Sequence, residues 1–307
     1  MKKIFENWIS PLTWKQLQKE NTTAHRIFSS EQGWIERWNE YLLISYYETN
    51  FRNQIIPKIK SWASHMAFPY SRLWGRHLTH QATEKNLPEL IEGKPPSTFL
   101  TTVQERSINF QIDFHAGYSL GLFLDQRNNR NFVQQQKPKK LLNCFAYTGS
   151  FSVMAALGGG ETLSIDLSQK SLLRAKENFR LNQLDPSHHR FWTEDVRESL
   201  PKLQRRKETF DIIILDPPTF SRAKKSGKEK IFRIERDLSS LLEAALPLVT
   251  SPGKIFISTN CNRLAKDDLI QLCHTTLINR PFQFHHEPPL PDIPEAMAAQ
   301  TVWLLLQ

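Results

Sequence analysis

One segment constrains the fold most: the apolar run Phe210–Leu215 (FDIIIL), which is followed at once by Asp216–Phe220 (DPPTF). A short run rich in isoleucine is typical of a parallel strand that is buried on both faces. Two consecutive prolines can neither continue a strand ladder nor enter a helix interior, so the next peptides form a stiff, extended loop. In open α/β sheets, ligands bind at this carboxyl edge of the strands. The loop offers a carboxylate, backbone carbonyls and the aromatic face of Phe220, which together suit a planar base; an ordinary strand-to-helix turn is the alternative.

An upstream segment predicts the opening of a nucleotide-binding sheet. Lys140–Asn143 (KLLN) indicates a short strand, Cys144–Gly149 (CFAYTG) a tight turn, and Ser150–Leu157 a helix. Strand, turn and helix in this order begin a doubly wound sheet. Only Gly149 stands where a dinucleotide-binding loop has three glycines, which let the backbone close around a pyrophosphate. The loop therefore favours a cofactor without phosphates, such as S-adenosylmethionine, over a nicotinamide dinucleotide.

Acids follow the next predicted strands as well. Asp166 comes after the apolar run Glu161–Ile165, and Asp195 comes after a run at about Arg190–Thr193. An acid at the tip of the second strand is placed to accept both hydroxyls of a ribose, and one at the third can accept a hydrogen bond from an adenine amine. A single such acid means little because Asp is common in turns and caps. Asp166, Asp195 and Asp216 at the ends of successive strands form a far more specific pattern.

These segments carry a family resemblance. NCFAYTGSFSVMAALGG, SIDLSQKSLLRAKENFRLNQL, TEDV and DIIILDPPTFSRAKK resemble the bacterial class I S-adenosylmethionine-dependent 23S ribosomal RNA methyltransferases, and more narrowly the large-subunit family with a cytosine-C5 and a guanine-N7 enzyme. His115–Arg127 is similar to that family's K-T-G-aromatic-aromatic-L-D-Q-R segment, with Ser119 and Leu120 in place of the Lys and Thr. Gly33–Ser45 resembles the family's hairpin. The resemblance covers about residues 25–307.

The resemblance implies an α/β fold, with a Rossmann-like class I methyltransferase sheet that has helices on both faces and follows a smaller α+β domain with a β-hairpin. It also implies S-adenosyl-L-methionine as cofactor and ribosomal RNA, of the large subunit, as partner. The residues expected to bind the cofactor are Asn143, Phe145, Ala146, Tyr147, Thr148, Gly149, Asp166, Ser168, Asp195, Val196 and Asp216. The residues expected to hold a flipped base are Asp216, Pro217, Pro218 and Phe220.

Cys261 leaves the target base open. It follows a predicted strand in the run STNCN, where the cytosine-C5 members carry a cysteine. Carbon 5 of cytosine is a poor nucleophile until a thiolate adds to carbon 6, whereas guanine N7 has an in-plane lone pair and needs no such activation. The runs DPPTFSRAKK and FRIERDL resemble the guanine-N7 members more closely. A guanine nitrogen is the narrowly preferred acceptor, and cytosine carbon 5, with Cys261 as nucleophile, is the alternative. In a third interpretation, Cys261 is only a small buried residue that packs beside a strand.

A basic segment follows the prolines and is expected to be a loop that covers the site. Arg222, Lys224, Lys225 and Lys228 lie directly beside the predicted base pocket, so we expect them to contact RNA phosphates. A merely solvated loop is the alternative. Other functions also stay open: a nicotinamide-dependent oxidoreductase on a similar sheet, or a non-catalytic RNA-binding protein that keeps the fold. DNA and protein are further substrates that the fold alone does not exclude.

Bulk properties set the remaining expectations. A chain of 307 residues has room for two domains, expected at 1–133, which could contact RNA, and 134–307. The net charge of +9 suits a polyanionic partner. Three cysteines without disulfide or metal spacing predict a cytoplasmic protein with no metal, and we expect no membrane span or signal peptide. The family that the chain resembles often carries an RNA-binding module before the hairpin domain, and we expect this chain to be too short to hold it.

Secondary structure outside these motifs follows from periodicity. The further helices are expected at Asn50–Met66, Ser168–Asn182 with Ser168 as N-cap, Phe232–Leu246 and Lys266–Ile278. The further strands are expected at Arg26–Phe28, Tyr41–Tyr46, Lys254–Thr259 and Thr301–Gln307, with a β-hairpin at Thr101–Phe114. A closing antiparallel hairpin would have Pro288–Pro294 as the connection between its strands.

Overall fold

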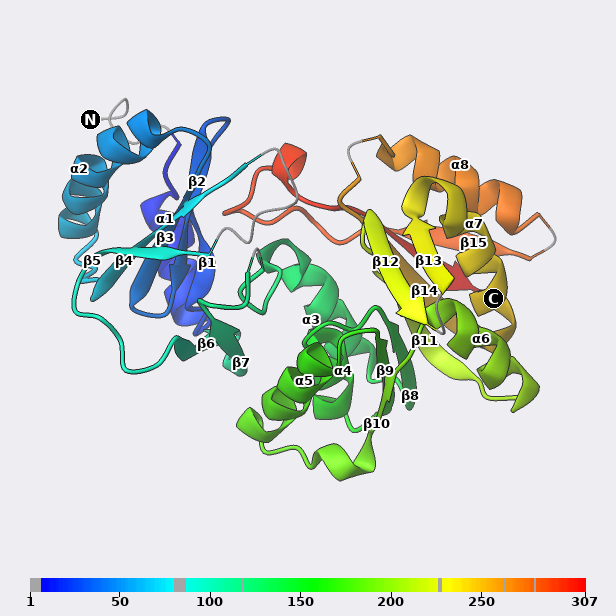
Figure 1. The fold of residues 1–307 in the computed structure, drawn as a ribbon. Helices are drawn as coiled ribbons and strands as arrows, with labels where there is room; N and C mark the ends of the chain where they lie inside the picture. The colour runs from blue at the N-terminus through cyan, green and yellow to red at the C-terminus, as the bar shows by residue number, and fades with distance from the viewer. Residues whose placement is uncertain (1–6, 80–86, 118, 226–227, 262, 279) are drawn as a thin grey trace. The chain divides into compact units, whose positions relative to one another are not determined.

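Two compact units make up the chain. The computed structural model describes residues 7–79, 87–117, 119–225, 228–261, 263–278 and 280–307, without the side chains of 223–230 (Figure 1). The first unit contains residues up to Arg127 together with Pro289–Met297, and the second contains Asn128–Pro288 and Ala298–Gln307. The domain limits 1–133 and 134–307 stay a prediction.

The second unit is built on a seven-stranded sheet with the order β10-β9-β8-β11-β14-β16-β15. The chain runs outward from β8 to β9 and β10 on one side, and then returns to β11 and β14 on the other. This reversal between β8 and β11 is the switch point at which doubly wound sheets bind ligands. The parallel strands are β8 (Lys140–Cys144), β9 (Glu161–Asp166), β10 (Arg190–Thr193), β11 (Phe210–Leu215) and β14 (Val249–Thr259). The antiparallel strands are β16 (Gln300–Leu306) and β15 (Phe282–His285).

Helices cover both faces of this sheet, as Figure 1 shows. They are α3 (Arg127–Gln136), α4 (Ser150–Leu157), α5 (Gln169–Leu181), α6 (Val196–Arg205), α7 (Ile234–Ala245) and α8 (Lys266–Thr276). The predicted Rossmann-like class is therefore confirmed. Ser168 caps α5 as predicted, because its hydroxyl accepts a hydrogen bond from the Ser171 N–H at 3.1 Å.

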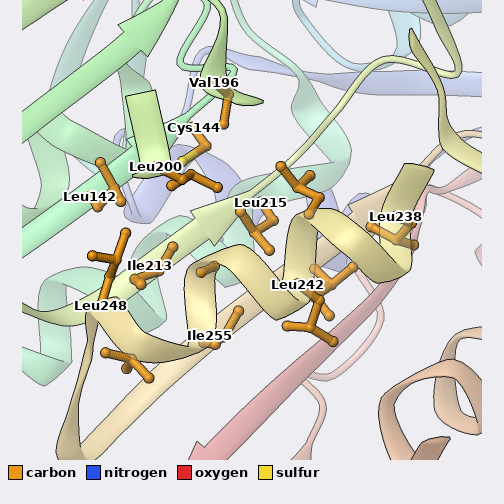
Figure 2. Packing of buried hydrophobic residues seen from close by; sticks show 14 of the residues in the cluster. Leu142, Cys144, Val196, Leu200, Ile213, Leu215, Leu238, Leu242, Leu248 and Ile255 are labelled. Carbon is orange, nitrogen blue, oxygen red and sulfur yellow. The ribbon is translucent and has the colours of Figure 1, made fainter. Parts of the chain in front are cut away.

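The core follows the two-residue period of the strands. Figure 2 shows Leu142 and Cys144 of β8, and Ile213 and Leu215 of β11, on the side of the sheet where α6 and α7 pack. From the next strand, β14, the neighbouring residues Ile255 and Phe256 point to opposite faces: Ile255 belongs to the same cluster, whereas Phe256 packs on Phe151 of α4 with ring centroids 5.4 Å apart. Burying each such aliphatic side chain contributes about 1.5–3 kcal/mol.

A two-stranded ribbon replaces the predicted basic loop, and here the prediction was wrong. Strands β12 (Phe220–Lys225) and β13 (Lys228–Arg233) pair antiparallel, with Phe220 opposite Arg233 and Arg222 opposite Ile231. The many charges of this segment obscured one apolar anchor, Phe232, which is 1% exposed and packs in the core. For the same reason α7 begins at Ile234, after the ribbon, and not at Phe232.

The first unit contains a five-stranded sheet, and the predicted hairpin is confirmed. The sheet order is β1 (Ala24–Ser30), β2 (Gly33–Trp38), β3 (Tyr41–Tyr46), β4 (Arg72–His77) and β5 (Glu89–Glu92). The helices are α1 (Pro11–Lys19) and α2 (Thr49–His65), and the hairpin is β6 (Leu100–Glu105) with β7 (Ile108–Asp113). Among the described residues of the two units, the short 3₁₀ helices are η1 (Leu124–Gln126), η2 (Pro186–His188), η3 (Leu246–Leu248) and η4 (Glu295–Met297).

A buried ion pair holds the proline-rich connection in the first unit. The guanidinium of Arg127 donates to both carboxylate oxygens of Asp292, each at 2.9 Å, and neither residue is more than 8% exposed. The backbone N–H of Arg26 donates to the same carboxylate at 3.1 Å. Bidentate arginine–carboxylate pairs are among the strongest hydrogen bonds in proteins, and breaking a buried one leaves an uncompensated charge. The connection between β15 and β16 is therefore an integral part of the first unit's interior.

Candidate cofactor and substrate site

The loop after β8 is a strained, tight turn. Phe145, Tyr147 and Gly149 adopt positive φ angles of 58°, 48° and 71°. Non-glycine residues rarely adopt such angles, and they are concentrated at functional sites. The single glycine also has a packing role, because a Cβ on Gly149 would stand 2.8 Å from the Cβ of Ala175 on α5. The loop therefore packs directly against α5.

Buried polar side chains support this loop from beneath. The Asn143 amide donates to the Ser152 hydroxyl at 3.0 Å, and that hydroxyl is 2.8 Å from the hydroxyl of Ser164. The Asn178 amide donates to the Thr148 carbonyl at 2.9 Å. Asn143, on β8, and Thr148, in the loop, are 2% and 1% exposed, so protein groups surround both side chains. Their role in cofactor binding stays a prediction. Ser152, Ser164 and Asn178 were missed, because small polar residues inside apolar runs carry no signal of their own.

Asp166 at the end of β9 ties the loop to α5. One carboxylate oxygen accepts the Tyr147 N–H and the other accepts the Ser168 N–H, both at 2.8 Å. Burial raises the pKa of Asp166 above its usual range, although both N–H groups act in the opposite direction. Each oxygen keeps a further lone pair, so the half-buried carboxylate can still accept hydroxyl groups.

Asp195 is held by an arginine that sequence reasoning missed. Arg197 donates from its Nε to Oδ1 at 3.1 Å and from Nη2 to Oδ2 at 2.8 Å, while its backbone N–H is capped by the same carboxylate at 2.9 Å. Burial would raise the pKa of Asp195, but the hydrogen bonds and charge of Arg197 leave it below its usual range. Val196 is 2% exposed and its side chain lies in the core, so only its backbone is available to a ligand (Figure 2).

Asp216 lies at the centre of the sheet's carboxyl edge. The residue before it, Leu215, pairs with Cys144 on one side and Ile257 on the other. Asp216 is half-buried, Pro217 is buried, and Pro218 is exposed. The Ile234 N–H donates to the Thr219 carbonyl at 3.2 Å, which joins the proline loop to the start of α7. The loops after β8 and β11, both predicted as site elements, are therefore neighbours.

The predicted phosphate contacts lie on the ribbon. Phe220, 43% exposed, and Arg222, which is also exposed, lie on β12. Lys224, Lys225 and Lys228 follow along the same two strands, and their side chains lie outside the described part of the structure. Phe232, on the opposite face, packs on Phe145 of the loop after β8 with ring centroids 5.6 Å apart. The ribbon thus rests on the candidate cofactor loop.

Cys261 lies just after β14 and beside a carboxylate. It is 5% exposed and belongs to the main apolar cluster. Its thiol is 3.8 Å from Oε1 of Glu235, the second residue of α7, and that oxygen is also 3.5 Å from Nη1 of Arg263. The Cys261 sulfur is therefore enclosed by protein groups. Burial raises the pKa of the other two thiols, to about 12 for Cys273 and further for Cys144.

The polar groups of this site fit S-adenosylmethionine. A carboxylate with free lone pairs stands beside a tight loop that has one glycine, so the site can bind a ribose but has no glycine-rich cradle for a pyrophosphate.

Among the described residues, no group of three or more His, Cys, Asp and Glu side chains could hold a metal ion. No helix in that part of the chain is long and apolar enough to cross a membrane.

Comparisons with known proteins agree on one family. Residues 56–295 match the family described as S-adenosylmethionine-dependent methyltransferase. The Bacillus subtilis protein YwbD, provisionally named a ribosomal RNA large subunit methyltransferase, is 32% identical over 258 residues, which cover 80% of this chain and 63% of that protein. Ribosomal RNA large subunit methyltransferase I of Enterobacter sp. (strain 638) is 38% identical over 183 residues, which cover 59% of this chain and 45% of that protein.

Solved structures share the fold. The crystal structure of SMU.776, provisionally called a methyltransferase and complexed with SAH, is 23% identical to this chain with a TM-score of 0.82. The similarity covers 99% of this chain and 80% of that one. At this identity the likeness supports the fold alone. The chain spans 63% and 45% of the lengths of the two curated relatives above.

Proposed function

Because the chain belongs to the S-adenosylmethionine-dependent methyltransferase family, we propose that it transfers a methyl group to a base of large-subunit ribosomal RNA in the cytoplasm. A guanine nitrogen is the preferred acceptor. The observation that carries the proposal is the carboxyl edge of the sheet, where the loop fastened by Asp166 lies next to the Asp216–Phe220 loop. One loop is suited to the nucleoside part of a cofactor and the other to a planar base.

The cofactor side uses the ends of β8, β9 and β10. Asp166 would accept the ribose hydroxyls, and the turn from Asn143 to Gly149 would surround the methionine part. Asp195, held by Arg197, and the backbone of Val196 would bind the adenine edge. When bound, S-adenosylmethionine supplies a methyl group on a positively charged sulfur. The charge of Asp166 and its two N–H contacts fix the loop before binding, so little ordering remains to be done.

The substrate side would take a base that has left its stack. Asp216 would accept hydrogen bonds from the base edge, and Pro217 and Pro218 would hold the loop rigid. Phe220, at the end of the loop, would offer an aromatic surface to the RNA beside that base. The rate gain would come mainly from alignment, because a well-oriented pair of reacting groups avoids most of the entropic cost of encounter.

The surroundings of Cys261 support guanine over cytosine. Attack on cytosine needs the Cys261 sulfur to reach carbon 6 of the base, but Cys261 is only 5% exposed and its sulfur lies 3.8 Å from Oε1 of Glu235. A guanine nitrogen lone pair needs no thiolate. Cytosine-C5 chemistry remains the second candidate on one observation: Cys261 stands at the carboxyl end of β14, the strand directly beside β11.

Ribosomal RNA as the substrate is supported by charge and by the relatives. The chain carries a formal charge of +9, and the ribbon beside the site holds several basic residues. Both curated relatives are named as large-subunit ribosomal RNA methyltransferases. A non-catalytic RNA-binding protein would need none of the fastening around Asp166 and Asp195.

The substrate class can be tested with a labelled methyl donor. The purified protein is incubated with deproteinised large-subunit RNA, small-subunit RNA, transfer RNA, DNA or total protein, with Asp166→Ala as the inactive control. We expect label in large-subunit RNA only. Label in none of the nucleic acids, with intact binding of S-adenosylhomocysteine, would refute an RNA substrate.

A further inference from the structure

The outer face of the ribbon carries an aromatic ring between two arginines. Phe220 and Arg222 are two positions apart on β12, and Arg233 is directly opposite Phe220 on β13. These register positions place all three side chains on one face. The guanidinium carbons of Arg222 and Arg233 lie over the Phe220 ring, 5.2 Å and 5.7 Å from its centroid.

This face differs from the one beneath it. Phe232, on the inner face, is 1% exposed and packs on Phe145, so the ribbon's anchoring is accounted for there. Phe220 is 43% exposed, and both arginines are exposed as well. A large aromatic side chain kept in solvent between two cations is the arrangement that binds nucleic acids, in which bases stack on rings and guanidinium planes while phosphates pair with the charges.

We propose that Arg222, Phe220 and Arg233 form a binding platform for a single-stranded RNA nucleotide that flanks the methylated base. The base stacks on the ring or on a guanidinium plane, and the exposed guanidinium of Arg233 binds the adjoining phosphate. Arg233 is the residue that sequence patterns did not single out, because it becomes a partner of Phe220 only through the ribbon's register. The proposal rests on the RNA substrate proposed above.

The position of the platform explains why it takes a flanking nucleotide. Phe220 is the last residue of the DPPTF segment, and the carbonyl of Thr219 before it is hydrogen-bonded to Ile234 just after Arg233. Both strands of the ribbon therefore leave the sheet edge at the proline loop. An RNA strand that delivers a base to Asp216 and Pro217 would next meet the platform.

The test measures RNA binding, separately from methyl transfer. A fluorescently labelled single-stranded fragment of large-subunit RNA is titrated at several salt concentrations with wild type, Arg233→Ala, Phe220→Ala and Phe220→Trp. The control is Arg180→Ala, an exposed arginine that pairs with Glu177 on α5. Binding of S-adenosylhomocysteine to each variant verifies folding.

Each variant has a distinct expected signature. Arg233→Ala should lower affinity and reduce the log–log salt slope by about 0.7, the value for one lost phosphate contact on a single strand. Phe220→Ala should lower affinity roughly 5- to 150-fold with little change in slope, which corresponds to the loss of one stacked base. Phe220→Trp should keep the affinity, and Arg180→Ala should match wild type.

Two outcomes overturn the platform. If Arg233→Ala and Phe220→Ala bind RNA like Arg180→Ala, the three residues do not contact RNA; a lower melting temperature in the same variants would assign them to stiffening the ribbon. If the wild type methylates RNA but Arg233→Ala has an unchanged KM for RNA, the platform is refuted while the proposed function stands. Conversely, platform-dependent RNA binding without any methyl transfer would refute the proposed function and support the platform.

Discussion

Replacing Asp166 with alanine tests how the cofactor site is built. The carboxylate accepts two backbone N–H groups at 2.8 Å, from Tyr147 and Ser168, and it would accept the two ribose hydroxyls in addition. A hydrogen bond to a charged acceptor contributes about 1.5–3 kcal/mol, so loss of the ribose contacts alone should cost about 3 kcal/mol or more. That corresponds to a loss of affinity of at least about a hundredfold.

Calorimetric titration with S-adenosylhomocysteine provides the measurement. Asp185→Ala is the matched control, because that carboxylate also accepts two hydrogen bonds, from the Ser187 backbone and hydroxyl, at the exposed start of η2. The control should bind like wild type. In wild type, affinity should fall on acidification as Asp166 is protonated, beginning at a higher pH than for an ordinary aspartate because its pKa is raised in the free protein. Unchanged binding by Asp166→Ala would refute the placement of the cofactor.

Three further outcomes follow from other parts of the structure. Cys261→Ala should keep methyl transfer and lose only about 1 kcal/mol of unfolding free energy. Cytosine chemistry would be supported instead if this variant were inactive while still binding S-adenosylhomocysteine, and if the wild-type protein formed a covalent adduct with RNA containing 5-fluorocytosine. Arg197→Ala should lower both the melting temperature and the affinity for S-adenosylhomocysteine. Arg197→Lys should not restore them, because lysine cannot make the two-point contact with Asp195. Wild-type affinity in either variant would contradict the role of Arg197 in holding Asp195. His25 is fully buried, and its pKa is lowered from 6.5 to about 3, chiefly by burial and then by Arg37. Between pH 6.5 and about 3, His25 is therefore protonated in the unfolded chain but not in the folded one. The unfolding free energy should fall by up to about 1.4 kcal/mol per pH unit as the pH drops through this range. Denaturant titrations of His25→Gln should show a shallower pH dependence than wild type, and equal slopes would contradict the assignment.

The sequence was most informative where a motif and a local rule coincided. The strand before DPPTF, the turn ending at Gly149 and the cap at Ser168 each follow from short-range chemistry, and the structure places all of them as predicted. The predicted family and cofactor are confirmed by the match over residues 56–295, and the fold class is confirmed by the sheet order and by the solved structures. The roles of the individual site residues stay predictions.

Features that depend on distant partners could not be predicted. Asp292 reads as part of a proline-rich connection, and only the fold brings Arg127 to it across 165 positions of sequence. The ribbon was missed because the charges of the segment outnumber its one buried anchor, Phe232. Arg197 was not singled out from the sequence, because its contact with the Ile231 carbonyl at 3.2 Å requires the ribbon.

The identity of the nucleoside that receives the methyl group distinguishes guanine chemistry from cytosine chemistry. Large-subunit RNA is incubated with the protein and a deuterated methyl donor, digested to nucleosides and analysed by mass spectrometry, with Cys261→Ala in parallel. A deuterated methylguanosine formed equally by wild type and Cys261→Ala is the predicted result. Deuterated 5-methylcytidine that is lost in Cys261→Ala would contradict the account, because the buried thiol beside Glu235 would then be the nucleophile.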